Sequence, residues 1–167
     1  MNLSKEILMW DGKSADSITY IFKKYSKKSL FEKDLIDLIS SEDTDKGASW
    51  LLKKWLESGN NLAEKDVKNL CGKLLELQNW ETKLHILQSL PYLDFNKSEC
   101  LTIYAFLKSS LTNSNKFVRA WTYNGFYELA ARFPEYTEET KKYFDMAMKD
   151  EAASVKARIR KILKRGF

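Results

Sequence analysis

Apolar residues recur at intervals of three and four along most of the chain, which is the period of an amphipathic α-helix. No segment alternates apolar and polar residues long enough to indicate a strand. We therefore predict an all-α protein. The segments that carry the helical pattern are 14–25, 29–39, 45–56, 63–77, 80–90, 98–111, 115–133, 137–149 and 154–164.

The helical pattern repeats itself. Four basic positions lie 37, 36 and 37 residues apart: Lys46, Lys83, Arg119 and Lys156. Three apolar positions between them keep a constant interval of 37 residues: Leu70, Leu107 and Phe144. A period of this length is typical of a solenoid, in which each helix pair buries its apolar face only by stacking on its neighbours.

The repeat also predicts the domain organisation. The chain has two prolines and six glycines in 167 residues, and no run resembles a flexible linker, so we expect a single domain. The expected parts are an N-terminal extension (1–13), four helix-pair repeats (14–41, 42–78, 79–114 and 115–150) and a basic capping helix (151–167). The segment 115–133 is the longest and is apolar on most sides, so it should be the central helix of the C-terminal half.

The net charge of +5 is concentrated in the last predicted helix. Outside six basic residues of that helix, the chain has one more acidic than basic residue. The helix should dock through Val155, Ile159, Ile162 and Leu163, which lie on one side of it. Its basic residues are Lys156, Arg158, Arg160, Lys161, Lys164 and Arg165.

Several features bear on cellular location. Residues 1–10 do not have the pattern of a secretion signal, and no apolar stretch approaches the length needed to cross a bilayer. Cys71 and Cys100 both fall on apolar helix faces, so we predict buried thiols and no disulfide. We expect a cytoplasmic protein that does not bind membranes.

The segment Lys116-Phe117-Val118-Arg119-Ala120-Trp121 resembles the first helix of a HEAT repeat. That family places an Asp or Asn in the turn before a valine-arginine-small triplet. Asn113 and Asp150 stand six residues before Arg119 and Lys156 in the same way. The resemblance covers about residues 45–165 and implies a right-handed α-α superhelix of about four helix pairs plus a terminal helix. In HEAT arrays the arginine and the acid form an internal ladder.

One enzymatic group shares this fold. Bacterial alkylpurine DNA glycosylases have a HEAT-like superhelix with an aspartate one helical turn after a tryptophan. The residues four positions beyond each tryptophan of this chain are not acidic: Ser14, Lys54, Gly59, Leu84 and Gly125. The fold analogy therefore comes without the catalytic carboxylate.

The sequence contains no pattern typical of a catalytic, cofactor or metal site. There is one histidine, His85, and it lies beside apolar residues, so we expect a structural role. The two cysteines lack zinc-site spacing, and the glycines are too isolated to form a phosphate loop. We predict a protein that is not an enzyme and has no cofactor.

The candidate binding residues allow two interpretations. The ladder bases are either a positive stripe that follows phosphates or an acidic partner, or an internally paired ladder. The basic helix is either a solvated cap or a contact surface. Large aromatic side chains such as Trp50, Trp55, Trp80 and Trp121 are expected mostly in the core. The candidates are Lys46, Lys83, Arg119, Trp121, Asn124, Lys156, Arg160 and Lys164.

A solenoid without catalytic groups is suited to binding. We expect a non-catalytic scaffold or adaptor that binds another macromolecule, a protein above all, through its concave face or its basic C-terminal end. The alternative is nucleic-acid binding through a basic stripe. The fold analogy does not decide between them, because function depends on the site.

Overall fold

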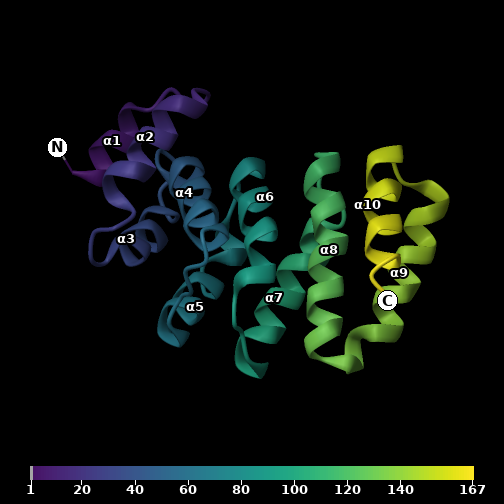
Figure 1. Ribbon diagram of the computed structural model, residues 1–167. Helices are drawn as coiled ribbons and strands as arrows, with labels where there is room; N and C mark the ends of the chain where they lie inside the picture. Colours follow the sequence, from purple (N-terminus) through teal and green to yellow (C-terminus); the bar gives the residue numbers. More distant parts are fainter. Residues whose placement is uncertain (1) are drawn as a thin grey trace. The chain divides into compact units, whose positions relative to one another are not determined.

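The computed structural model describes residues 2–167, and every regular element in that part of the chain is a helix (Figure 1). The all-α prediction is confirmed. No helix in this region combines the length and the apolar composition that crossing a bilayer requires. The helices form two compact units, one ending at Phe95 and the other spanning Asn96–Phe167. The division into four repeats stays a prediction.

In the first unit, α4 is the central helix, and it packs against α2, α3 and α6. Leu51 and Leu52 of α4 are fully buried. The chain leaves α4 through Gly59, whose positive φ of 90° fits the expected glycine stop. The helices of this unit are α1 (Leu3–Met9), α2 (Ala15–Tyr25), α3 (Phe31–Leu38), α4 (Asp45–Glu57), α5 (Glu64–Cys71), η1 (Leu74–Glu76), α6 (Trp80–Ser89) and η2 (Leu90–Tyr92).

The helix predicted at 63–77 is shorter than expected. α5 ends at Cys71 with Gly72 as its C-cap, and the 3-10 helix η1 follows. Glycine is a poor helix former, so the helix ends there. The bend still buries Leu74 and Leu77.

The predicted N-terminal extension contains a helix, α1. The Asn2 side chain caps it by accepting a hydrogen bond from the Lys5 backbone N–H, and Ile7 is buried. Seven residues are too few to hold a helix in water alone, so packing must stabilise α1. Ile7 and Trp10 approach the backbone of α4 at Gly47, where an added Cβ would lie 2.8 Å from Ile7 Cγ2 and 3.3 Å from Trp10 Cε3.

In the second unit, α8 packs against α7, α9 and α10, which confirms its central position in this half. Its 17 residues make it the longest helix of the described chain. The buried core between α8, α9 and α10 consists of Ala120, Tyr123, Phe144, Ala147, Val155, Ile159 and Ile162. The helices are α7 (Lys97–Ser110), α8 (Lys116–Arg132), η3 (Pro134–Tyr136), α9 (Thr137–Asp150) and α10 (Ala153–Leu163).

α7 begins at Lys97, one residue before the predicted segment 98–111, and Asn96 caps it in a capping box with Glu99. The expectation of a core position was wrong for one tryptophan. Trp80 is 41% exposed, because it occupies the first position of α6, where the helix surface is open. Trp55 is buried as expected, and Trp50 and Trp121 are half-buried.

The contact at Gly47 gives a stability prediction. Gly47→Ala should lower the free energy of unfolding by about 1–3 kcal/mol, because the new methyl group overlaps Ile7. In an unobstructed helix the same change would be stabilising. Urea denaturation measures the difference.

Gly72→Ala is the matched control. An added Cβ there meets atoms no closer than 3.5 Å, so this variant should be as stable as the wild type or more stable. A Gly47→Ala variant that unfolds at the same urea concentration as Gly72→Ala would contradict the packing of α1 on α4.

Candidate functional site

In the first unit, Lys46 forms an ion pair with another residue of the protein. Its Nζ lies 2.6 Å from Glu81 Oε2, and both side chains are largely shielded from solvent. The same Nζ is 5.7 Å from the centroid of the Trp10 ring. Lys83 is half-buried and has no ion pair within the described part of the chain.

In the second unit, Arg119 makes more hydrogen bonds to protein groups than Lys46 does in the first. Its Nε and Nη2 donate to the two carboxylate oxygens of Glu151, at 2.7 and 3.1 Å. Nη1 donates to the carbonyl oxygens of Asn113 and Ser114. The hydrogen bond from Arg119 holds the pKa of the Glu151 carboxyl below its ordinary value, although burial opposes this. Arg119 therefore contacts the turn before α8, but its acidic partner is Glu151 and not Asp150.

Lys156 occupies the last ladder position, and its Nζ donates to the carbonyl oxygen of Lys149 at 3.1 Å. Lys46, Arg119 and Lys156 thus each bind groups of the protein itself. The geometry of these three favours the internally paired ladder over a free positive stripe.

The other basic residues of α10 differ from the ladder. Arg160, Lys161 and Lys164 are exposed, and none of them has an ion pair in the described residues. On the opposite side of the helix, Val155, Ile159 and Ile162 are fully buried. That part of the predicted docking stripe is confirmed. Leu163 is not part of it, since it is 42% exposed.

Trp121 lies on a side of α8 that α10 approaches. The guanidinium carbon of Arg158 is 4.1 Å from the centroid of the Trp121 ring, a close cation–π contact. The guanidinium of Arg165 lies 5.9 Å from the ring centroid of Tyr127. Asn124 is buried, and its Oδ1 has no hydrogen-bond partner among the described residues.

Arg158 and Arg165 were predicted as basic residues of the last helix, but they were not among the candidate binding residues. The sequence does contain a signal for the contact of Arg158 with Trp121, because the two residues are separated by the repeat interval of 37 residues. Equivalent positions of successive repeats are expected to be neighbours, so the pair was accessible from the periodicity. The Arg165–Tyr127 contact follows no such interval.

The electrostatic environment of this surface is unfavourable for its cations. Burial lowers the pKa of Arg158, and the nearby charge of Arg165 lowers it further. Burial raises the pKa of Glu128 on α8, whereas the charges of Arg132 and Arg165 act in the opposite direction. No carboxylate forms an ion pair with Arg158 or Arg165 in the described chain. An incoming anion would offset this repulsion.

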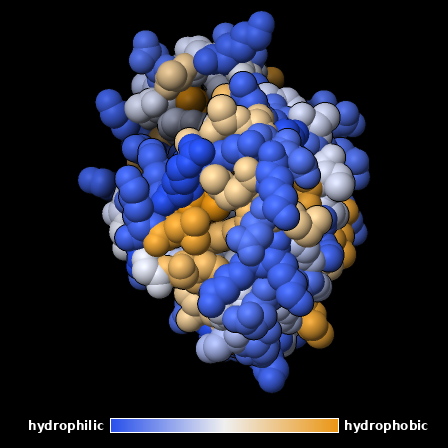
Figure 2. Space-filling view, turned by 90° about the vertical axis from the view of Figure 1, so that its right-hand side faces the viewer, coloured by the Kyte–Doolittle hydropathy of each residue, from blue (hydrophilic) through white to orange (hydrophobic). Residues whose placement is uncertain are grey.

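The basic end of the second unit also carries apolar surface. Figure 2 shows the face that lies at the right of Figure 1, with an orange patch between blue, hydrophilic side chains. The large apolar side chains that α9 and α10 expose are Met146 and Leu163, at 63% and 42%. A mixed apolar and basic surface is typical of protein-binding sites.

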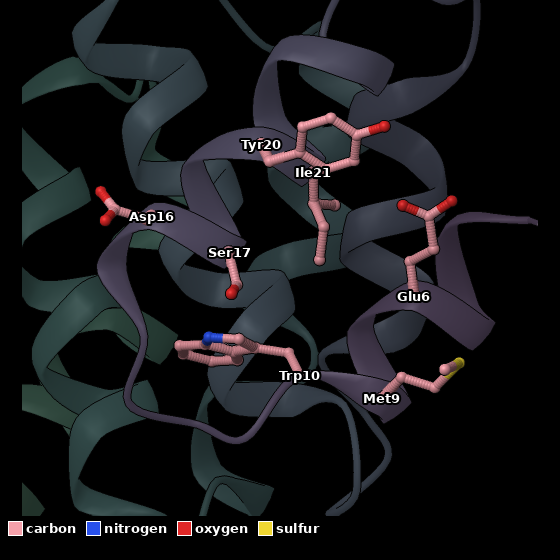
Figure 3. A pocket seen from close by; sticks show the side chains of 7 residues that line it. All are labelled: Glu6, Met9, Trp10, Asp16, Ser17, Tyr20 and Ile21. Carbon is pink, nitrogen blue, oxygen red and sulfur yellow. The ribbon is translucent and has the colours of Figure 1, made fainter.

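A separate pocket of about 410 Å³ lies beside α1 and α2 (Figure 3). Trp10 and Met9 approach it from one element, Tyr20 and Ile21 from the other, and Asp16 points away. The carboxylate of Glu6 at its edge already accepts hydrogen bonds from Lys24 and Tyr25. The pocket therefore offers mainly aromatic and apolar surface.

The one histidine has a structural environment. His85 Nδ1 lies 2.9 Å from Ser49 Oγ, and Ser49 is fully buried. Burial lowers the pKa of His85 to about 3, so its ring is neutral at neutral pH. Cys71 and Cys100 are both buried, as predicted. Among the described residues, no group of three acidic, histidine or cysteine side chains is arranged to hold a metal ion.

Comparison of the chain with protein-family models, with curated proteins and with solved structures finds no match in any of the three. The surface of α8 and α10 is therefore interpreted from its own geometry.

The Arg119–Glu151 pair gives a pH-dependent prediction. Because the folded-state pKa of Glu151 is lowered, the pair stabilises the fold above the ordinary glutamate pKa, and this contribution is lost as the pH falls through the lowered value. A double-mutant cycle with Arg119→Gln and Glu151→Gln should give a coupling energy of about 1–2 kcal/mol at pH 7. The coupling should shrink below about pH 4.

The exposed pair Lys141–Glu138, with its charged atoms 3.6 Å apart, is the control. Its cycle should give a coupling close to zero at both pH values. Equal coupling energies for the two pairs at pH 7 would show that Arg119 and Glu151 are not an effective internal link.

Proposed function

We propose that the helix pairs stack as HEAT-like repeats in a right-handed superhelix. Two internal links support this, since Lys46 bonds to Glu81 of the following pair and Arg119 bonds to Glu151 in the same direction. The packing of α4 on α6 and of α8 on α10 fits the same plan.

A crystal structure gives the test of this architecture. Successive pairs, α4 with α5, α6 with α7 and α8 with α9, should superpose after one repeated right-handed rotation. Pairs related by unrelated rotations would contradict the superhelix.

We further propose that the protein is a non-catalytic scaffold that binds another protein, and that the basic face of α10 is its contact surface. The observation that carries this is the set of exposed cations at Arg160, Lys161 and Lys164, which no carboxylate of the described chain neutralises. A partner with an acidic surface is complementary to them. The exposed Leu163, next to Lys164 on the chain, and the exposed Met146 of the same unit favour a protein over a nucleic-acid backbone.

The alternative is nucleic-acid binding, which the same cations would support through phosphate contacts. The internal bonding of Lys46 and Arg119 reduces the basic stripe to the end of the second unit. Binding by that end alone would still depend steeply on salt concentration, so salt does not separate the two candidates. Nuclease treatment does.

The test is a pull-down from a lysate of the native host. The triple variant Arg160→Gln, Lys161→Gln, Lys164→Gln should retain at least about tenfold less of an acidic partner protein than the wild type, because it lacks the complementary charges. Quantitative mass spectrometry measures the bound protein, and nuclease-treated lysate should give the same result.

A charge-matched variant is the control. Lys5, Lys65 and Lys68 are exposed residues of the first unit, and their replacement by glutamine changes the net charge equally. This control should retain the partner. If both triple variants behave alike, the basic face of α10 is not the contact surface. If nuclease removes the bound material, the alternative function holds.

A further inference from the structure

We propose that Arg158 and Arg165 form a two-guanidinium site that binds two carboxylates, about 9 Å apart, on an acidic segment of the partner protein. This inference rests on the proposed function and gives the basic end its chemical specificity.

Both arginines approach aromatic side chains of α8, Arg158 closely and Arg165 at the limit of cation–π distance. Arg158 lies over Trp121 and Arg165 over Tyr127, at 4.1 and 5.9 Å from the ring centroids. A guanidinium that is already stacked loses little conformational freedom when it binds, and its planar fork can donate two parallel hydrogen bonds to a carboxylate. Lysine cannot reproduce this geometry.

Arg119 of the same unit is a contrasting case, because its guanidinium donates hydrogen bonds to Glu151 and to two backbone carbonyl oxygens. Arg158 and Arg165 have no corresponding hydrogen bonds in the described chain. Their donors are therefore available to an external acceptor.

The two arginines also destabilise each other. The charge of Arg165 adds to burial in lowering the pKa of Arg158. The half-buried carboxyl of Glu128 interacts with the charge of Arg165 without forming an ion pair with it in the described chain. External carboxylates would supply the missing negative charge.

The spacing of the site defines the segment it fits. Arg158 lies on α10, whereas Arg165 lies just beyond its end. The rings that they contact, Trp121 and Tyr127, are six residues apart on α8, which corresponds to about 9 Å along its axis. Two acidic residues three positions apart in a polyproline II segment lie on one side of it, about 9 Å apart. Two acidic residues seven positions apart in a helix have nearly the same separation.

The probe is a pair of proline-rich peptides of equal composition and charge. One carries two glutamates separated by two prolines, and the other carries two adjacent glutamates, which point to different sides of the peptide. The wild-type chain should bind the first at least about tenfold more tightly, since only that peptide engages both arginines. Fluorescence anisotropy at low ionic strength measures the two affinities.

The decisive variant keeps the charge. Arg158→Lys combined with Arg165→Lys should reduce the preference for the spaced peptide to less than about twofold, because the planar forks are lost. Lys65→Arg combined with Lys68→Arg, on the exposed surface of the first unit, is the charge-conserving control and should keep the full preference. Trp121→Leu should weaken binding of the spaced peptide, and Glu128→Gln should strengthen it by removing a competing carboxylate. Circular dichroism checks that each variant is folded.

Three results would overturn the inference: equal affinity of the wild type for both peptides, a preference that survives the double lysine variant, or tighter binding of a short oligonucleotide with the same dependence on the two arginines. The first two leave the proposed function standing if the pull-down still depends on Arg160, Lys161 and Lys164. If the pull-down does not depend on Arg160, Lys161 and Lys164 but the wild type still prefers the spaced peptide, the proposed contact surface is wrong and the two-arginine site stands.

Discussion

The burial of three aliphatic side chains of α10 against α8 determines how the basic end of this protein is presented. Val155, Ile159 and Ile162 are fully buried, so α10 has one rotational setting on its neighbour. In that setting Arg158 meets Trp121, and the remaining cations face outward. Without this packing the helix would be a short basic peptide with no defined surface. The proposed binding site is therefore a consequence of core packing.

The basic residues of the chain fall into two classes that the sequence alone does not separate. Lys46 and Arg119 are linked to Glu81 and Glu151, so their charges hold helices together. The exposed cations of the basic end, Arg160, Lys161 and Lys164, have no such partner among residues 2–167. Equivalent spacing in the sequence therefore indicates a common structural role for the ladder, while the end of the array carries charge that is available for binding.

Much of the fold was predictable from the sequence, because three- and four-residue spacing identifies helices and the turn residues Gly59, Pro91 and Pro134 lie where they end. The helix α1 was missed because a short segment has a weak periodic signal and is stabilised by its contact at Gly47. The docking stripe of α10 was predictable, whereas the pairing of Arg165 with Tyr127 was not. Side-chain contacts between helices depend on their rotation and offset, which periodicity does not fix.

The most direct test of the account follows the indole N–H signals of the five tryptophans by NMR while an acidic peptide is added to the ¹⁵N-labelled protein. Because Arg158 lies on the ring of Trp121, binding at the α8–α10 surface should shift the Trp121 signal in a saturable way. The signals of Trp50 and Trp55 in the first unit should stay in place. A bound peptide that leaves the Trp121 signal unmoved, or that shifts the signals of the first unit instead, would contradict the account.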